Sequence, residues 1–502
     1  MLKSLTSGAV LFASLAAALS CAPLAADAPS ASLESTAITL PESRPRPPFD
    51  FDPADAAFLD EVQHGAFNFL WTCISPANGM VYDRSDVTVI SIGGVGFQLS
   101  AIPVGIERGW ITRDQGEARA LQILRALEAA PDNRIHGLFF HFLDPHTAGY
   151  THQGYEKIVS TVDSALFFAG ALTAGSYFGG EIADIADRLF AGADWTFFLA
   201  PDSAPPHERG FISLGWKSTG KGDDITTGEL LPFYWIDTGD EQLLTTFLAV
   251  AAPNPDYRID PSVYYRLRRR LGSYGDIGPF VWFPWSGSLF TNVFAHCWID
   301  YAHLGIDDPQ AAGVDHRPRV DWWANSAMAV EMHRAKAIEN PKGLPTLGPN
   351  AWGLTSCDFA GGYLVPSLFP TDVPMPDATP EIDYSTYQPT EQWGDGTVAT
   401  YGAAMAILFD PDHALAALRH YRALAASDRL PALWADPATG GYGFADSFNE
   451  GTGWVSPLHF AIDAGPIVLA IENARTGLVA REFHKNPAVR AACQRLHLRL
   501  AR

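Results

Sequence analysis

Cysteine and basic residues are both scarce in this chain of 502 residues. After Cys21, four cysteines remain, widely spaced and without a C-x-x-C pair: Cys73, Cys297, Cys357 and Cys493. This spacing argues against a disulfide scaffold or a zinc ribbon, and leaves room for one or two disulfides. The 34 Lys and Arg residues stand against 56 Asp and Glu, for a formal net charge of −22. Because phosphate binding needs a basic surface, we do not expect a nucleic acid partner.

Long hydrophobic runs are also lacking, apart from one at the N-terminus. There, Lys3 precedes the apolar stretch Gly8–Leu19, which is too short to span a bilayer and is typical of an export signal. We expect a signal peptide over residues 1–21 and a periplasmic, outer-membrane-anchored or secreted protein. Cys21 could carry a lipid, and cleavage by ordinary signal peptidase after Ser20 or Ala26 is the alternative. The membrane is expected as a partner only through that lipid.

Residues 22–53 are rich in Ala, Pro and Ser, which predicts a linker. We expect one domain over residues 54–502, and a monomer. Helical periodicity recurs along it, over residues 58–71, 117–129, 164–176, 181–190, 261–271, 322–337, 399–409, 460–473 and 488–500, and in a helix that opens at Asp410-Pro411. Strand-like alternation is confined to residues 80–92 and 138–142.

The helices are of two kinds. Residues 164–176 are apolar all round, as in an inner helix, whereas residues 181–190 carry one apolar stripe, as in an outer helix. This alternation predicts an all-α (α/α)6 toroid, a barrel of helical hairpins whose long loops form the cleft. An open solenoid would show a repeat of fixed length, and none is seen. In residues 261–271 we expect the arginines, Arg266, Arg268, Arg269 and Arg270, on a solvated helix face.

Aromatic residues are abundant: 14 Trp, 16 Tyr and 30 Phe. They suit either sugar stacking or simply a large core. Acids lie among them in three loop clusters, which contain Asp144, Glu156 and Asp163; Asp223, Asp224, Glu229 and Asp237; and Asp395 with Asp446. Glycoside hydrolysis needs two such carboxyl groups, one protonated and one ionised.

Glu229 is our candidate for the protonated group. It precedes the run LLPFYW, and burial beside Phe233, Tyr234 and Trp235 would raise its pKa. As an acid before an apolar run, it could instead serve only to begin a helix.

Rival sites are weaker. Four histidines near Asp144, namely His136, His141, His146 and His152, match no zinc-ligand spacing, so we expect hydrogen-bonding side chains there, and neither a metal nor an organic cofactor. The glycines of Gly93–Gly96 resemble part of a dinucleotide loop but lack its βαβ context.

Six segments between Gly137 and Gly477 occur in an order that resembles a known family. They are FHFLDPHTAG, STVDSALFFAGAL, HCWIDYAH, WGDGTVATYGAAMAILFDPD, YGFADSFN and IDAGPIVLAIENARTG. The chain resembles the bacterial glucoamylase-like family, which includes endo-β-1,2-glucanases and the β-1,2-glucanotransferase domain of cyclic glucan synthases. The resemblance implies an (α/α)6 toroid, no cofactor, and glycosidic-bond chemistry on β-glucan.

The resemblance also implies a role for Asp395, which would lie at the mouth of the toroid and bind or help activate near the scissile sugar. The alternative is that Asp395 only caps the next helix. The chain departs from the family where many members carry a Glu two residues before the Ser of S-x-x-D. Ile158 stands there, with Glu156 nearby.

Together these observations predict an exported glycoside hydrolase acting on an oligo- or polysaccharide, with β-1,2-glucan as the leading substrate. The expected catalytic residues are Glu229, Asp395 and Asp446; the expected substrate-binding residues are Asp144, Asp163, Glu156, His141, Trp235, Trp393, Tyr401 and Asn449. The candidate acids come from separate loops, and the hydrolases that this chain resembles invert the anomeric centre. We therefore expect inversion. A transglycosylase, a non-hydrolytic glycan-binding protein and a hydrolase of another bacterial glycan remain alternatives. A lyase is less favoured because the clusters hold little Arg.

Overall fold

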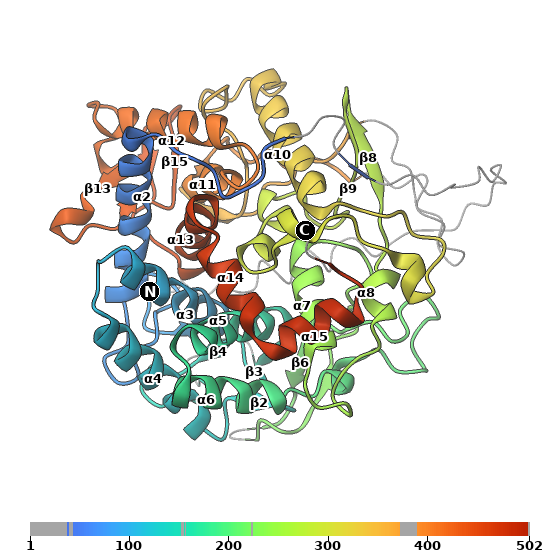
Figure 1. The fold of residues 1–502 in the computed structure, drawn as a ribbon. Helices are drawn as coiled ribbons and strands as arrows, with labels where there is room; N and C mark the ends of the chain where they lie inside the picture. The colour runs from blue at the N-terminus through green and yellow to red at the C-terminus, as the bar shows by residue number, and fades with distance from the viewer. Residues whose placement is uncertain are drawn as a thin grey trace, which may run out of the picture.

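A computed structural model describes residues 38–39, 44–151, 155, 157–221, 224–371 and 389–499. The helices are α2 (Pro53–Thr72), α3 (Ile92–Glu107), α4 (Arg113–Ala129), α5 (Thr161–Phe178), α6 (Gly180–Ala191), α7 (Asp240–Ala251), α8 (Ser262–Arg266), α9 (Tyr301–Leu304), α10 (Trp322–Glu339), α11 (Thr400–Ala406), α12 (Pro411–Ala425), α13 (Ala461–Arg475), α14 (Leu478–Lys485) and α15 (Pro487–Arg495). The protein is an (α/α)6 toroid, which confirms the predicted fold (Figure 1).

The inner ring is built from helices that pack against their neighbours in turn. Helix α3 contacts α5 on one side and α13 on the other, α13 contacts α11, and α5 contacts α7. The 3₁₀ segments η2 (Leu289–Asn292) and η3 (Phe294–Cys297) continue the ring beyond α7. Helices α2, α4, α6, α10 and α12 lie outside it.

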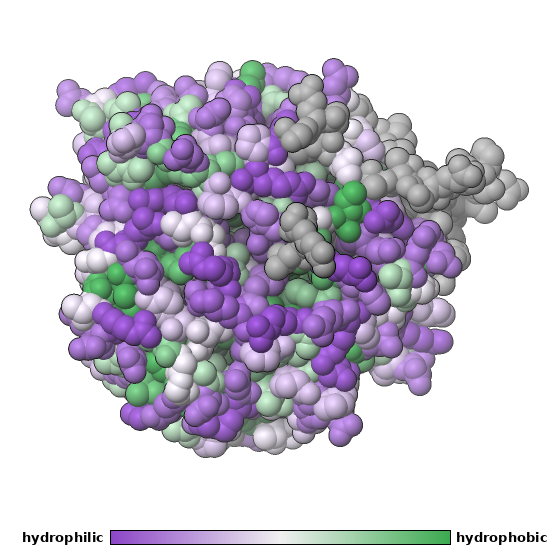
Figure 2. Space-filling model, in the orientation of Figure 1, coloured by the Kyte–Doolittle hydropathy of each residue, from purple (hydrophilic) through white to green (hydrophobic). Residues whose placement is uncertain are grey.

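The inner and outer helices differ as their sequences predict. Helix α5 is buried on every side over most of its length, whereas α6 buries only one stripe, which includes Ile182, Ile185 and Leu189. The short helix α14 contacts α3, α5 and α13 and crosses the centre of the view in Figure 1. Figure 2 shows this face as mostly hydrophilic, with hydrophobic residues in small scattered groups.

The glycines at residues 93–96 serve helix packing. A Cβ on Gly96 would lie 2.2 Å from the Leu166 carbonyl oxygen, and one on Gly170 would lie 1.9 Å from that of Gly96. Only glycine allows α3 and α5 to approach this closely, so the likeness to a dinucleotide loop has a structural explanation.

The strands are short and lie in small antiparallel sheets. They are β1 (Ile90–Ser91), β2 (Arg134–Ile135), β3 (Leu138–Phe139), β4 (Phe142–Leu143), β5 (Ile158–Ser160), β6 (Gly215–Ser218), β7 (Gly228–Leu230), β8 (Leu271–Tyr274), β9 (Ile277–Val281), β10 (Cys357–Phe359), β11 (Gly362–Leu364), β12 (Val398–Ala399), β13 (Trp434–Ala435), β14 (Gly443–Phe444), β15 (Ser447–Asn449) and β16 (Trp454–Val455). The strand-like pattern over residues 80–92 yields only β1 and isolated bridges.

The expectation for the arginine run was wrong. Helix α8 ends at Arg266, and the next three arginines are buried: Arg268 pairs with Asp237, and Arg269 pairs with Asp307. Because ion-pair partners from distant segments neutralise Arg268 and Arg269, these two arginines need no solvated face.

The described part of the predicted linker is also packed against the body. Ile38 is 3% exposed, and its backbone N–H donates to the Arg319 carbonyl at 2.8 Å. Arg46 donates to the Ala302 carbonyl at 2.8 Å and pairs with Asp321. From Arg44 onward the chain therefore belongs to the folded body.

No helix among the described residues is long and apolar enough to span a bilayer. The four cysteines that follow Cys21 are all free.

Candidate active site

Acidic side chains gather where the inner helices begin. Asp163 lies in the first turn of α5, Glu241 in that of α7 and Asp463 in that of α13. Asp83, from the loop before α3, and Asp446, just before β15, complete a group that we call the acid arc: Asp83, Asp163, Glu241, Asp446 and Asp463. Charge interactions link its neighbours, Glu241 with Asp163, Asp163 with Asp83, and Asp83 with Asp463. The arc therefore follows the ring at one end of the toroid.

Glu241 is half-buried as a residue, and its carboxyl group lies in the buried part. Burial, with smaller contributions from the charges of Asp163 and Asp240, raises its pKa to about 8. The neighbouring Asp240 is buried, accepts a hydrogen bond from the Ala295 N–H at 2.9 Å, and also has a pKa raised by burial to about 8. Near neutral pH, Glu241 is therefore mostly protonated and can give up a proton.

Asp446 and Asp463 form a buried pair on the opposite part of the arc. The Asp446 Oδ2 accepts from the Asp358 N–H at 2.9 Å and the Ser447 hydroxyl at 3.0 Å. Burial raises the pKa of Asp446 to about 6, while these hydrogen bonds oppose the rise. Burial and the adjacent Asp446 raise the pKa of Asp463 well above its usual range. At neutral pH the pair thus holds one proton, on Asp463, and Asp446 is ionised.

Asp83 and Asp163 lie between these two parts. The His141 Nε2 is 3.7 Å from the Asp163 Oδ1, and burial raises the pKa of Asp83. A Cβ on Gly93 would lie 2.6 Å from the Asp163 Oδ1, so this glycine leaves the space that the carboxylate occupies.

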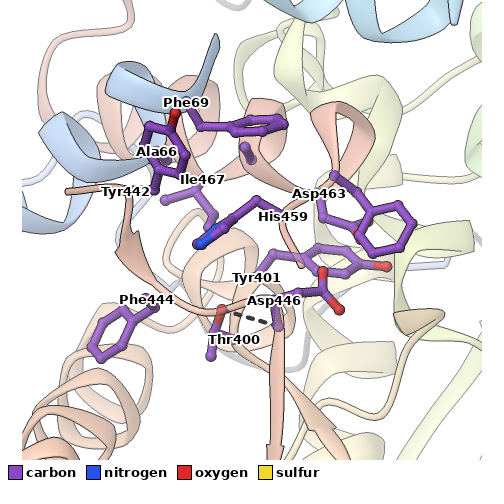
Figure 3. Close-up of a pocket in the computed structure, with 12 residues that line it drawn as sticks. Ala66, Phe69, Thr400, Tyr401, Tyr442, Phe444, Asp446, His459, Asp463 and Ile467 are labelled. Atoms are coloured by element: carbon purple, nitrogen blue, oxygen red, sulfur yellow. Dashed lines mark hydrogen bonds between the residues drawn. The ribbon is translucent and has the colours of Figure 1, made fainter. Parts of the chain in front are cut away.

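A pocket adjoins the Asp446–Asp463 pair (Figure 3). Helices α2, α11 and α13 and the β14 region supply its lining: Ala66, Phe69, Thr400, Tyr401, Tyr442, Phe444, Asp446, His459, Phe460, Asp463, Ala464 and Ile467. Of the predicted site residues, only Asp446 and Tyr401 line it. The buried Tyr401 hydroxyl donates to the Ser356 carbonyl at 2.8 Å.

The reason for choosing Glu229 was wrong. Glu229 is exposed on β7, where it pairs in register with Lys217 of β6. Because its carboxyl group faces water, the aromatic residues that follow it do not desolvate it. Asp224 of the same cluster is exposed as well, and hydrogen bonds from Thr226 and Thr227 lower its pKa to about 2.

Asp395 and Asp144 each stabilise a local turn. The exposed Asp395 accepts from the Thr397 N–H and hydroxyl at 3.0 and 2.7 Å. It does not cap α11, whose N-cap is Ala399. Asp144 accepts from the backbone N–H groups of His146 and Thr147, both at 2.9 Å, which contribute to the lowering of its pKa.

Three other predicted binding residues have structural partners. The Trp393 Nε1 donates to Glu391 at 3.0 Å, and the buried Asn449 donates to the Asp395 carbonyl at 3.1 Å. Trp235 is half-buried and donates to the Thr161 hydroxyl at 3.2 Å, two residues before Asp163. Of these, Trp235 therefore lies beside the acid arc. Glu156, Asp223 and His152 lie outside the described residues.

Sequence reasoning missed Glu241, Asp463 and Asp83. The signal for Glu241 was a pair of adjacent acids, Asp240-Glu241, after Gly239 and before the largely apolar run QLLTTFLAVAA. Asp463 lies within IDAGPIVLAIENARTG, but no partner in the sequence pointed to it.

The histidines near Asp144 do not converge on one point. His136 stacks on Phe197 with ring centroids 3.6 Å apart, whereas His141 faces Asp163. Within the described ranges, no group of three or more His, Cys, Asp or Glu side chains is arranged to hold a metal ion. That the protein needs neither a metal nor an organic cofactor stays a prediction to be tested.

Known proteins are similar to this chain in sequence and fold. The chain is 27% identical over 471 residues to an exo β-1,2-glucooligosaccharide sophorohydrolase (non-reducing end) from Parabacteroides distasonis, a match that covers 88% of this chain and 58% of that protein's length. A crystal structure from Bacteroides uniformis, described as that of a putative glucoamylase, has a TM-score of 0.70 and 28% identity and covers 89% of this chain and 98% of its own. That of a β-1,2-glucanase from Parabacteroides distasonis has a TM-score of 0.69 and 25% identity and covers 88% of this chain and 60% of its own.

The family model described as "Putative glucoamylase" matches residues 233–487, more than half of the chain. This match includes Glu241, Asp446 and Asp463. The chain belongs to this glucoamylase-like family.

Proposed function

We propose that this protein is a glycoside hydrolase that cleaves β-1,2-glucan, with Glu241 as general acid and Asp446 as general base. One observation carries the assignment. The same end of the toroid holds two buried carboxyl groups, that of the half-buried residue Glu241 with a pKa of about 8 and that of Asp446 with a pKa of about 6. At pH 7 the first is mostly protonated and the second mostly ionised, as acid/base hydrolysis requires.

In the proposed reaction, Glu241 gives its proton to the glycosidic oxygen as the bond to the anomeric carbon breaks. Asp446 takes a proton from the water that attacks that carbon. We expect inversion because the two groups come from separate segments, Glu241 from the first turn of α7 and Asp446 from the chain just before β15. A retaining mechanism needs its two carboxyl groups close together, about 5 Å apart.

The relatives support the substrate. The similar proteins from Parabacteroides distasonis are named for β-1,2-linked glucans. Half-buried Trp235 beside the arc offers a ring on which a sugar can stack.

The proposal is tested with a panel of β-glucans and reducing-sugar release as the readout. We expect β-1,2-glucan to be cleaved and the first product to be the α-anomer by proton NMR. A first β-anomer would contradict inversion. Binding without cleavage would favour a glycan-binding protein, and transfer to added sugar a transglycosylase.

The pH profile tests the residue assignment. Below about pH 6 Asp446 gains a proton, and above about pH 8 Glu241 loses one, so kcat/KM should fall roughly tenfold per pH unit on each side. A profile flat from pH 5 to 9 would contradict the assignment.

We also propose export, on the basis of the apolar run Gly8–Leu19 behind Lys3. Cell fractionation should place the protein outside the cytoplasm. Loss of membrane association in Cys21→Ser would identify a lipid anchor.

A further inference from the structure

The pocket behind the Asp446–Asp463 pair has an outer and an inner end. Tyr442 and His459 are half-buried, whereas the ten other lining residues are buried. Their rings lie 5.1 Å apart, on the side of the pocket where Phe69 of α2 lies (Figure 3). The pocket thus runs from a partly exposed rim to the two carboxyl groups.

The space is suited to water and too small for sugar. About 20 Å³ is open to the centre of a water molecule, which is room for about one water. The walls are largely apolar, with Ala66 and Phe69 from α2 facing Ala464 and Ile467 from α13. A pyranose ring does not fit there.

The inner end is polar. The two carboxyl groups share a hydrogen bond, and Asp446 Oδ1 and Asp463 Oδ2, both buried, have no other partner in the described part of the chain. Buried polar atoms usually have a partner in the protein or in ordered water, and a buried water needs two to four polar neighbours. These two oxygens supply two of them.

We propose that this pocket is the route by which water enters between Tyr442 and His459 and reaches Asp446. The inference rests on the proposed function. A bound glucan covers the mouth of the toroid, and an inverting reaction needs water on the face of the sugar away from the leaving group. One water proton passes to Asp446, the hydroxyl oxygen bonds to the anomeric carbon, and the leaving oxygen takes the proton of Glu241.

The test narrows the pocket without touching a carboxyl group. Ala464→Val adds two methyl groups to the wall, one residue after Asp463. We expect kcat for β-1,2-glucan oligosaccharides to fall about tenfold or more. To measure the Kd of these oligosaccharides by calorimetry without cleavage, Glu241→Gln is added to the wild type and to Ala464→Val. The two Kd values should agree within about twofold. Ile467→Val widens the same wall and should keep kcat within about twofold.

A second measurement does not need catalysis. Infrared spectroscopy can follow the carbonyl band of protonated Asp463, which is assigned by its loss in Asp463→Asn. In D₂O the carboxyl proton should exchange and shift this band rapidly in the wild type, and more slowly in Ala464→Val. Unchanged exchange in a folded Ala464→Val protein would overturn the water route, even if the chain were not a hydrolase. A Kd weakened tenfold with kcat retained would also overturn it, because the pocket would then bind sugar. If the wild type cleaves no glucan but Ala464→Val slows exchange, the proposed function fails and the water route stands.

Discussion

Two clusters of buried charge differ in how the protein neutralises them. In the arginine cluster, Arg269 is fully buried and binds Asp307 through two hydrogen bonds of 2.9 and 2.6 Å. Arg268 pairs with Asp237, and the Arg270 guanidinium lies 4.5 Å from the centre of the Trp282 ring. Each charge has a partner, and the cluster joins segments distant in sequence.

Among the described residues, few cations act on the carboxyl groups of the acid arc. Arg84 acts on Asp83 but pairs with Asp86 at 2.8 Å, and His141 is 3.7 Å from Asp163. Burial raises the pKa values of Glu241 and Asp463, and neighbouring acids contribute to the rise. Removing one partner of a buried ion pair leaves an uncompensated charge and destabilises the fold, whereas an acid neutralised by a proton can take part in catalysis.

The largest expected effect comes from removing the exchangeable proton of the arc. Glu241→Gln keeps the shape of the side chain but cannot protonate the leaving oxygen, so kcat should fall about 10²–10⁴-fold. An aryl glycoside, whose leaving group needs less protonation, should lose less. Glu229→Gln is the matched control and should keep kcat within about twofold. If Glu229→Gln lost as much as Glu241→Gln, the acid would be misassigned.

Breaking an ion pair of the arginine cluster should affect stability instead. Arg269→Ala leaves Asp307 buried and unpaired, and we expect the free energy of unfolding to fall by about 3–5 kcal/mol. Urea unfolding measures the change. Arg125→Ala, which breaks an exposed pair with Glu181, is the control and should alter little. Equal effects of the two substitutions would contradict the comparison.

The smallest expected effect is a gain in stability, whereas Arg269→Ala should cause a loss. Asp240 has a pKa of about 8 in the fold against about 4 when unfolded, so its contribution to stability is complete below pH 4 and is lost as pH rises towards 8. Asp240→Asn removes this loss and keeps an acceptor for the Ala295 N–H. At pH 7 we expect a higher free energy of unfolding than that of the wild type, with no difference near pH 3.5. Destabilisation at pH 7 would mean that Asp240 is ionised and paired.

The predictions for α5, α6 and Asp446 show how far local patterns reach. An all-apolar run identifies an inner helix, and a single apolar stripe identifies an outer one, because burial follows the helical period. Asp446 was chosen within a motif, and its burial is consistent with that choice. The prediction for the arginine run failed because the partners of these arginines, Asp237 and Asp307, lie about 30 to 40 residues away in the sequence. No local pattern reaches that far.

The sequence by itself determined the alternation of inner and outer helices, the family likeness, and the need for acids at the cleft. Only the tertiary structure decided which acids matter. A carboxyl group becomes an acid or a base through burial and through the charges beside it, and those neighbours come from different helices. Glu229 and Glu241 are both acids beside apolar runs, but the fold leaves Glu229 in water on β7 and places Glu241 next to Asp163 at the start of an inner helix.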